Sequence, residues 1–195
     1  MLYNKVLIKE YFNEKASSWD KNNIPKDEIL DLLFNEGSLI NGCSILDVGC
    51  GTGILFNYYN KNNAKSITGI DISKNMIDIA KSKYPNIKLI CDNILSFDDE
   101  NKYDVVVLYN TLPHIYDLDL LFANIKKLLI KDGKLIIAFG QSRDETNLIH
   151  KSVPDGISFE LPTLEDLCRI ISKYFIIDYS ISDDVLYEII CLNKD

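Results

Sequence analysis

Short hydrophobic runs alternate along the chain with longer segments whose apolar residues recur every three or four positions. The runs are rich in Ile, Val and Leu and end in turn or acidic residues, as buried parallel strands do. They span residues 43–48, 65–71, 86–91, 103–109 and 133–139, and the segments with helical spacing between them span 54–62, 73–84 and 118–130. This alternation is typical of βαβ units and predicts a doubly wound parallel sheet.

Turn-forming and capping residues mark the ends of these segments. Ser73 stands at the N-cap position of the helix predicted over 73–84, and Pro85 follows that helix. The tripeptide 131–133 (Lys-Asp-Gly) supplies a stop signal before the fifth strand. These signals agree with the hydrophobic pattern on where one element gives way to the next.

Two segments with amphipathic helical spacing, 6–19 and 25–37, precede the first strand. Pro25 stands at the first position of the second segment and Gly37 past its end, as is common at helix termini. We expect both helices to pack over one rim of the sheet.

The C-terminal part departs from the βαβ pattern. Residues 163–174 predict a helix, and 175–181 and 185–192 predict two strands separated only by residues 182–184. A parallel crossover needs about a dozen residues or more, so this pair is expected to form an antiparallel hairpin. The expected fold is therefore α/β, with a doubly wound, mostly parallel seven-stranded sheet.

The length of 195 residues predicts a single domain, because domains hold roughly 150 residues. Apolar residues make up 47% of the chain and charged residues 26%, which is ordinary for a globular protein. We divide the domain into an N-terminal helical cap (1–40), a core (41–140) and a C-terminal part with a loop, a helix and the hairpin (141–195).

Charge and hydropathy exclude several kinds of partner. The formal net charge is −8, which would repel a phosphate backbone, so nucleic acid is not an expected partner. No uncharged apolar run approaches the roughly 18 residues of a membrane span. Oligomeric state is open, although an exposed terminal hairpin could pair with a copy of itself.

The five cysteines predict neither a disulfide framework nor a metal site. Their number is odd, none forms a CxxC pair, and most lie in or beside apolar runs. We expect small buried hydrophobes in a reducing compartment, and hence a cytoplasmic protein. No His, Cys and carboxylate cluster has metal-ligand spacing.

The most informative segment is LDVGCGTG, residues 46–53, which follows an apolar strand and precedes a helical segment. Glycines at 49, 51 and 53 allow a sharp turn and the close approach of a ligand to the main chain. Asp71 ends the second strand, 18 residues after Gly53, where a carboxylate can accept hydrogen bonds from ribose hydroxyls. Together the two features predict a cofactor that contains a nucleoside.

The spacing of the glycines argues against a dinucleotide. The GxGxxG fingerprint would place its third glycine at position 54, which is Ile54, so the third glycine falls one place early. Asp47, two positions before Gly49, would discourage a pyrophosphate but could face the ammonium of an amino acid. An NAD-dependent oxidoreductase is therefore disfavoured.

In these motifs and their order, the chain resembles a class I S-adenosylmethionine-dependent methyltransferase. The segment LDVGCGTG resembles the first motif of that family, and Asp71 in GIDIS its ribose-binding acid. Further matches are CDNI (91–94), YDVVVLYNTLPHI (103–115) and LLIKDGKLIIA (128–138). The similarity is greatest to the small-molecule branch, which includes ubiquinone and menaquinone biosynthesis methyltransferases, and it implies a Rossmann-like methyltransferase fold.

The resemblance implies S-adenosylmethionine as cofactor and S-adenosylhomocysteine as product. Asp71 would hold the ribose, Ile72 and Ile94 would sandwich the adenine, and Asp92 and Asn93 would read its edge. The methionine part would lie against Asp47, Gly49, Cys50, Gly51, Gly53 and Asn110. Ile72 and Ile94 could equally be ordinary core residues.

The acceptor side is less determined by the sequence. Methyl transfer is an in-line displacement in which a general base is optional, and His114 is the candidate because it follows the fourth strand. Arg143 or His150, in the stretch after the fifth strand, could meet an anionic group, but a solvated loop with a short helix is an equal alternative. Tyr11 and Trp19 could belong to a lid over the cofactor or to ordinary packing.

The sequence therefore predicts a methyltransferase that acts on a small-molecule acceptor. Two alternatives stay open: a protein methyltransferase, and a protein that binds S-adenosylmethionine without catalysis and works as a regulator or subunit. The loops at 10–24, 110–117 and 140–162 have no spacing that selects oxygen, nitrogen, carbon or sulfur as the methylated atom.

Overall fold

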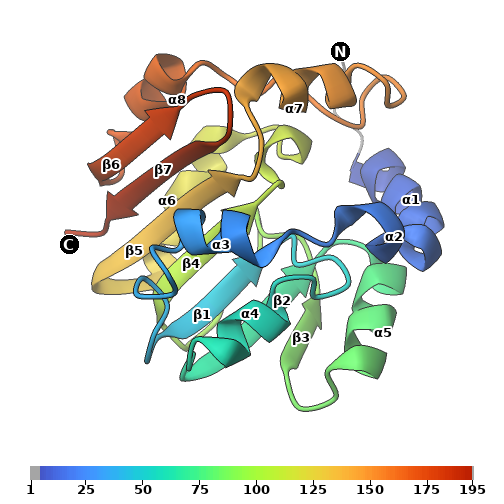
Figure 1. The fold of residues 1–195 in the computed structure, drawn as a ribbon, viewed down its shortest axis with the longest axis horizontal. Helices are drawn as coiled ribbons and strands as arrows, with labels where there is room; N and C mark the ends of the chain where they lie inside the picture. The colour runs from blue at the N-terminus through green and yellow to red at the C-terminus, as the bar shows by residue number, and fades with distance from the viewer. Residues whose placement is uncertain (1–4, 195) are drawn as a thin grey trace.

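The strands expected from the hydrophobic runs form one seven-stranded sheet in the order β3-β2-β1-β4-β5-β7-β6 (Figure 1). The computed structural model describes residues 5–194. The strands are β1 (Ser44–Val48), β2 (Ser66–Asp71), β3 (Lys88–Cys91), β4 (Tyr103–Tyr109), β5 (Leu129–Phe139), β6 (Ile176–Ser182) and β7 (Tyr187–Leu192). β1 to β5 pair in parallel, and β7 is antiparallel to both β5 and β6. The predicted α/β fold and its antiparallel C-terminal hairpin are confirmed.

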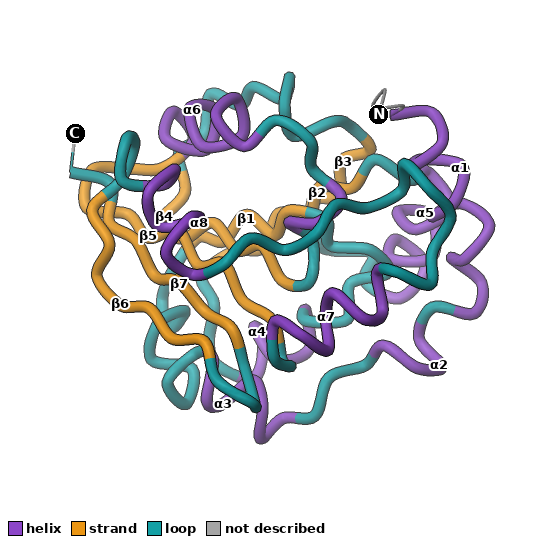
Figure 2. Tube along the Cα trace, turned by 90° about the horizontal axis from the view of Figure 1, so that it is seen from above, coloured by secondary structure: helices purple, strands orange, loops and turns teal. Residues whose placement is uncertain are grey.

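Helices cover both faces of this sheet. They are α1 (Lys5–Lys15), α2 (Asp20–Asn23), α3 (Asp27–Leu33), α4 (Phe56–Lys61), α5 (Lys74–Lys83), α6 (Leu118–Leu128), α7 (Arg143–His150) and α8 (Leu164–Ile171), with short 3₁₀ turns η1 (Ala16–Ser18) and η2 (Leu112–His114). One core cluster joins the sheet to α6 and α8, and a second joins it to α3, α4 and α5. Figure 2 shows α6 on one side of the strands and α3 and α4 on the other.

Local sequence signals explain where several helices begin. The Ser73 side chain accepts a hydrogen bond from the backbone of Met76, as the predicted N-cap requires. Ser142 and Glu145 form a reciprocal capping box at the start of α7. β4, at the centre of the sheet, is almost wholly buried, whereas the edge strand β6 is mostly exposed. This difference accounts for the continuous apolar run of the former and the mixed pattern of the latter.

The chain connections create a crevice at the carboxyl ends of β1 and β4. β1 pairs with β2 on one side and β4 on the other. The chain leaves β1 through α4 on one face and leaves β4 through α6 on the opposite face. Such a reversal of strand order is where open α/β sheets bind ligands.

Several element boundaries differ from the sequence prediction: the helix predicted over 25–37 spans only Asp27–Leu33, so Pro25 precedes it, and the helix predicted over 163–174 ends at Ile171. β5 begins at Leu129, where a helix end and a stop signal were expected, because Leu129 pairs with Tyr103 and Asp132 N–H donates to Asn193 O at 2.6 Å. Asp132, at φ 60°, turns within this strand and does not precede it. The helix predicted over 6–19 ends at Lys15 and continues as the 3₁₀ turn η1.

The cysteines only partly match the expectation of buried hydrophobes. All five are free, but burial is complete only for Cys50 and Cys191 among them; Cys91 is exposed. Across residues 5–194, no helix is long and apolar enough to cross a membrane.

Candidate active site

A cavity of about 370 Å³ opens at the carboxyl ends of the parallel strands. It is bordered by the last residues of β1 and β2, by the loop after β4, by α1 and by α7. Its lining includes most of the residues that the sequence singled out: Tyr11, Trp19, Gly49, Cys50, Gly51, Asp71, Ile72, Asp92, Asn93, Ile94, Asn110, His114 and His150. The crevice expected from the strand order is therefore the place where those residues meet.

The three glycines of the turn after β1 have different surroundings. All three have positive φ, at +69° for Gly49, +54° for Gly51 and +79° for Gly53. A Cβ on Gly49 would lie 2.5 Å from the Thr111 side chain, and one on Gly53 would lie 2.6 Å from the Phe56 ring. A Cβ on Gly51 would meet nothing closer than 3.6 Å. A Cβ on Gly51 would thus make only ordinary contacts with Trp19 and Met76, whereas the absence of a Cβ on the other two permits close packing.

Asp71 joins the ends of the two motifs. Its carboxylate accepts hydrogen bonds from Gly51 N–H at 2.9 Å and from Ser73 N–H at 2.8 Å. Burial raises the pKa of Asp71 to about 6, and these two bonds oppose the rise. Each carboxylate oxygen can accept a second hydrogen bond, so Asp71 retains capacity for two hydroxyl donors. The donor set of a ribose fits this acceptor.

Asp47 lies behind the glycine turn and is not part of the cavity lining that the structure describes. Its side chain is 2% exposed, and its Oδ2 has no hydrogen-bond partner. Burial raises the pKa of Asp47 to about 7, while the adjacent Tyr59 hydroxyl favours the charged form. Its position does not bring it to a ligand directly, and Gly53 also lies outside the lining.

The residues after β3 form a polar edge of the cavity. Asp92 N–H donates to Asp71 O at 3.1 Å, which ties the two acidic segments together. Asp92 Oδ1 accepts from Asn93 N–H at 2.7 Å, and Asn93 Oδ1 accepts from Leu95 N–H at 3.1 Å. Ile94 is buried and belongs to the core cluster as well as to the lining. Ile94 therefore belongs to the core, as one interpretation of the sequence held, and also borders the cavity in which the other placed the adenine.

The N-terminal helices cover the cavity from one side. Tyr11, Phe12 and Trp19 belong to its lining, and the Trp19 Nε1 atom lies 3.6 Å from the position of a Cβ on Gly51. Asn13 Oδ1 accepts from Ser73 Oγ–H at 2.7 Å. This contact fastens α1 to the start of α5.

A second fastening follows Trp19 in the chain. The Asp20 carboxylate accepts from Thr52 Oγ1–H at 2.5 Å and pairs with Lys83 Nζ at 2.8 Å. Partial burial would raise the pKa of Asp20, but the hydrogen bonds donated by Lys83 and Thr52 hold it below its usual value. The cover is thus attached both to the glycine turn and to α5.

The two histidines of the chain lie together on the opposite side. Their ring centroids are 4.9 Å apart, and the Phe12 ring contacts His114 edge-on at 4.8 Å. His114 Nδ1 lies 3.0 Å from Ile157 O, so this nitrogen carries the proton and Nε2 is free to accept one. Burial lowers the pKa of His114 to about 4 and also lowers the pKa of His150.

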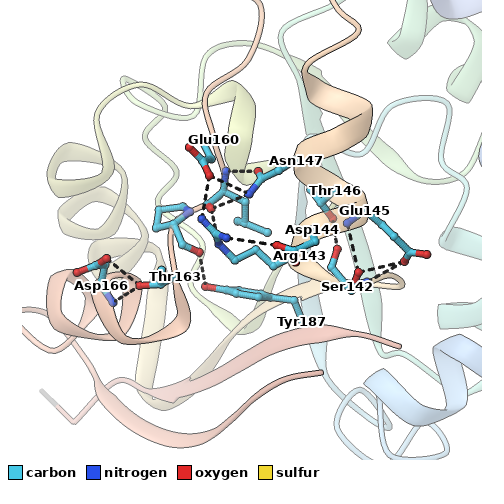
Figure 3. A network of polar contacts seen from close by, with 12 residues as sticks. Ser142, Arg143, Asp144, Glu145, Thr146, Asn147, Glu160, Thr163, Asp166 and Tyr187 are labelled. Atoms are coloured by element: carbon cyan, nitrogen blue, oxygen red, sulfur yellow. Dashed lines mark hydrogen bonds and ion pairs between the residues drawn. The ribbon is translucent and has the colours of Figure 1, made fainter. Parts of the chain in front are cut away.

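Arg143 points away from the cavity. Its Nε–H donates to Leu161 O at 2.9 Å, and its guanidinium pairs with Glu160 at 3.0 Å. Asn147, which lies on the same helix as Arg143, hydrogen-bonds to the backbone of Leu161. The Arg143 and Asn147 side chains therefore hold the 160–162 segment against α7 (Figure 3). The expectation that Arg143 meets an acceptor is not supported by this position.

Sequence reasoning missed several lining residues. Phe12 follows Tyr11 directly, and helical spacing with Ile8 was the signal that could have found it. Gln141 Nε2–H donates to Thr146 Oγ1 at 3.1 Å, and both line the cavity near α7. Within residues 5–194 no group of three His, Cys, Asp or Glu side chains could hold a metal ion.

Comparisons with known proteins agree with this geometry. The family model described as "Methyltransferase domain" matches residues 46–137. A malonyl-[acyl-carrier protein] O-methyltransferase of Priestia megaterium is 27% identical over 187 residues, which cover 86% of this chain and 68% of the relative. A ubiquinone biosynthesis O-methyltransferase of Coxiella burnetii is 32% identical over 104 residues, which cover 51% of this chain and 44% of the relative.

A solved structure supports the fold over the full chain. The magnesium protoporphyrin IX methyltransferase of Synechocystis PCC 6803, with S-adenosylhomocysteine bound, has a TM-score of 0.73 at 17% identity. The alignment covers 97% of this chain and 99% of that one. At this identity the likeness concerns the fold.

Proposed function

We propose that the chain is a class I S-adenosylmethionine-dependent methyltransferase that transfers the cofactor's methyl group to a small-molecule acceptor bound between α1 and α7. The observation that carries this proposal is the Asp71 carboxylate, held by Gly51 and Ser73 at the edge of a covered cavity. One relative is named for a malonyl group on acyl-carrier protein and another for ubiquinone biosynthesis, and the metabolite-sized groups in these names support the same class here.

We assign the cofactor-binding roles to this chain's residues as follows. Asp71 accepts the ribose hydroxyls, and charge-assisted hydrogen bonds of this kind contribute roughly 1.5 to 3 kcal/mol each. The glycine turn and the Asn110 backbone accommodate the methionine part, with Asp47 behind the turn acting through its field or through water. Ile72, Asp92, Asn93 and Ile94 surround the adenine. When bound, the cofactor's sulfonium supplies an electrophilic methyl carbon.

The protein's contribution to the reaction is positioning and exclusion of water. Tyr11, Phe12 and Trp19 cover the cavity, and Asp20 and Asn13 hold this cover in place. His114, with an unprotonated Nε2, is the group that can receive a proton from the acceptor. The cavity is a pocket of about 370 Å³ in a protein of net charge −8, which favours a small acceptor over nucleic acid. The free cysteines of the protein support a location in a reducing compartment such as the cytoplasm.

Calorimetric titration with S-adenosylhomocysteine tests the proposal without knowledge of the acceptor, with NAD as the control ligand. We expect binding of S-adenosylhomocysteine at about micromolar Kd, near −8 kcal/mol, and no binding of NAD. A folded, ligand-free protein that binds neither, or that binds NAD as tightly, would overturn the proposed function. Turnover with an acceptor separates an enzyme from a binding protein without catalysis.

A further inference from the structure

The strand β6 forms one edge of the sheet, and its outer side has no strand beside it. Within residues 5–194, the backbone hydrogen bonds of β6 join it to β7 alone. Figure 2 shows the strand at the outer margin of the molecule. Every second residue of such a strand turns its N–H and C=O groups outward, where they can pair with a strand of another chain.

The two edges of the sheet differ in their protection against such pairing. The opposite edge, β3, has four residues and begins with Lys88, which pairs with Asp99. β6 has seven residues and contains neither lysine nor proline. It has one bulge, between Ile177 and Tyr179, and residues 179–182 pair in regular register with β7. Short length, lysine and proline protect native edges, so β6 lacks most of this protection.

Apolar side chains accompany the free backbone of β6. Tyr179 lies opposite Ile190 and Ile181 opposite Glu188, so Tyr179 and Ile181 point to the same face of the sheet. Ile181 packs against the core cluster that includes α3, but Tyr179 is 47% exposed. Ile176, at the start of the strand, is 53% exposed. A further strand at this edge would cover part of this exposed apolar surface.

A second copy of β6 is complementary to this edge when the two strands run antiparallel about a two-fold axis at Ser180. Directly opposite residues then share a face, and Tyr179 of each copy lies opposite Ile181 of the other, which forms an apolar cluster of four side chains. Ser182 lies opposite the bulge at Asp178, so a hydroxyl meets a carboxylate. Asp178 is the one charged residue of β6, and no like charges meet in this register.

We infer that β6 is the interface of a homodimer, in which two copies pair antiparallel around Ser180 and join their sheets into one. This inference goes beyond the proposed function and does not depend on it, because no residue of β6 lines the cavity. The pairing occupies the free β6 edge of both copies, so this contact closes at the dimer. One strand from each side gives a small interface, and we expect a Kd of about 10 to 100 µM.

Sedimentation equilibrium of the whole protein up to about 500 µM tests the inference. We expect a reversible equilibrium between monomer and dimer. Tyr179→Lys removes an apolar contact and adds a cation at the edge, so it should raise the Kd at least about tenfold. Leu148→Lys makes a comparable change at an exposed position of α7 and should leave the Kd unchanged.

Three results would overturn the inference: a monomer at about 500 µM, association beyond the dimer, or a Kd that Tyr179→Lys leaves unaltered. Circular dichroism and S-adenosylhomocysteine affinity show whether each variant is folded. Loss of S-adenosylhomocysteine binding in the unmodified protein would contradict the proposed function and would leave the dimer measurement unaffected.

A cysteine at the two-fold axis tests the register. Opposite residues of antiparallel strands have Cα atoms about 4.5 to 5.5 Å apart, within the range of a disulfide. Ser180→Cys, made together with Cys168→Ser because Cys168 contacts Ser180, should therefore form a covalent dimer with oxidised glutathione.

Ser182→Cys in the same background is the matched control. Its two cysteines would lie roughly 14 Å apart along the strands, too far for a disulfide. We expect little covalent dimer from it, as from the Cys168→Ser protein alone. Equal cross-linking at 180 and 182 would contradict the register and the interface.

Discussion

At the scale of single residues, the glycine turn combines two requirements that the sequence shows as one motif. Gly49 lacks a side chain because Thr111 occupies the space, and Thr111 is itself held by hydrogen bonds to Val48 O and Tyr109 O. Gly51 lacks one although a Cβ there would make only ordinary contacts with Trp19 and Met76. The first glycine therefore serves the packing of the fold, whereas the second lines the cavity at the proposed cofactor site.

Substitution by alanine distinguishes these two roles. Gly49→Ala combines a positive φ with a clash against Thr111, so we expect a loss of about 2 to 4 kcal/mol in the free energy of unfolding. Gly51→Ala has only the φ penalty, about 1 kcal/mol, but its methyl group enters the cavity. We expect it to fold and to bind S-adenosylhomocysteine at least about tenfold more weakly. Denaturant titration and calorimetry measure the two effects, and equal stability of the two variants would contradict the assignment.

Asp71 is the residue on which we expect cofactor affinity to depend most. We expect Asp71→Asn to weaken S-adenosylhomocysteine binding at least about tenfold, because the ribose hydroxyls lose a charged acceptor. The pKa of about 6 adds a pH signature, since hydroxyl donors favour the ionised carboxylate: affinity of the unmodified protein falls as pH is lowered through 6.

The amide that Asp71→Asn introduces cannot ionise, so the affinity of this variant should lack the dependence on pH. Asp98→Asn is the matched control and should leave the affinity unchanged, because Asp98 is exposed and lies outside the cavity lining. Unchanged affinity in a folded Asp71→Asn protein would contradict the geometry of the site.

The sequence predicted the positions of individual site residues well where those positions depend on neighbouring residues in the chain. A glycine turn, a strand-end carboxylate and the N-cap Ser73 are set by neighbours within a few positions, and all appear where expected. The 150–162 segment folds back over α7. This return determines the surroundings of the unpartnered His150 Nδ1 and turns the Arg143 side chain towards Leu161 O, away from the cavity. No spacing in the sequence encodes that return.

At the scale of elements, the N-terminal cover is attached by few polar contacts. The α1–α2 region packs against α5, and Asp20 joins it to Thr52 and Lys83. Thr52 is fully buried, so loss of its acceptor leaves a hydroxyl without a partner. The Asp20 carboxylate beside Trp19 is therefore, with Asn13, one of the two side chains on which the attachment of the cover depends.

Removal of this carboxylate should loosen the cover without unfolding the sheet. We expect Asp20→Ala to speed dissociation of S-adenosylhomocysteine about fivefold, and Lys83→Ala to have a smaller effect because the Thr52 bond survives. Trp19 is the single tryptophan of the chain, so stopped-flow fluorescence reports the rate directly. Dissociation at the original rate in folded Asp20→Ala would show that the cover is not fastened by this contact.

Element boundaries were predicted less accurately than the elements themselves. The turn residues 131–133 were expected to separate a helix from a strand, but the pairing of Leu129 with Tyr103 extends β5 through them. The hydrogen bonds between Asp132, Gly133 and Asn193 come from the other end of the chain. Contacts between distant segments thus override local turn signals, and only the folded chain contains them.

At the scale of the whole molecule, burial shifts the titration of three carboxyl groups among residues 5–194. Burial raises the pKa of Asp47 to about 7, of Asp71 to about 6 and of Glu188 to about 8. Asp47 and Asp71 belong to the two motifs of the site, and Glu188 lies on β7 opposite Ala138, away from the cavity lining. Asp71 faces the proposed cofactor site, whereas ionisation of Glu188 only destabilises the fold.

Glu188 should therefore make the stability of the protein depend on pH in a definite direction. Its side chain is 3% exposed and its Oε1 has no hydrogen-bond partner. Because the folded pKa of about 8 lies above the ordinary value of 4.5, the folded state holds a proton that the unfolded state releases between these values. The contribution to the free energy of unfolding is thus fully present below pH 4.5, declines as pH rises to 8, and is then constant. The difference between the pKa values sets an upper limit of about 5 kcal/mol.

The Glu188→Gln variant isolates this contribution, because glutamine has the same shape and never ionises. Asp47, Asp71 and the histidines titrate equally in both proteins, so they cancel from the difference in stability. We expect the variant to gain at least about 1 kcal/mol relative to the unmodified protein between pH 5 and pH 8, measured by denaturant unfolding at several pH values. Glu14→Gln, at an exposed position on α1, is the control and should show a constant difference. Parallel curves for Glu188→Gln would mean that the carboxyl group finds a donor when it ionises, because only such a contact would offset its burial.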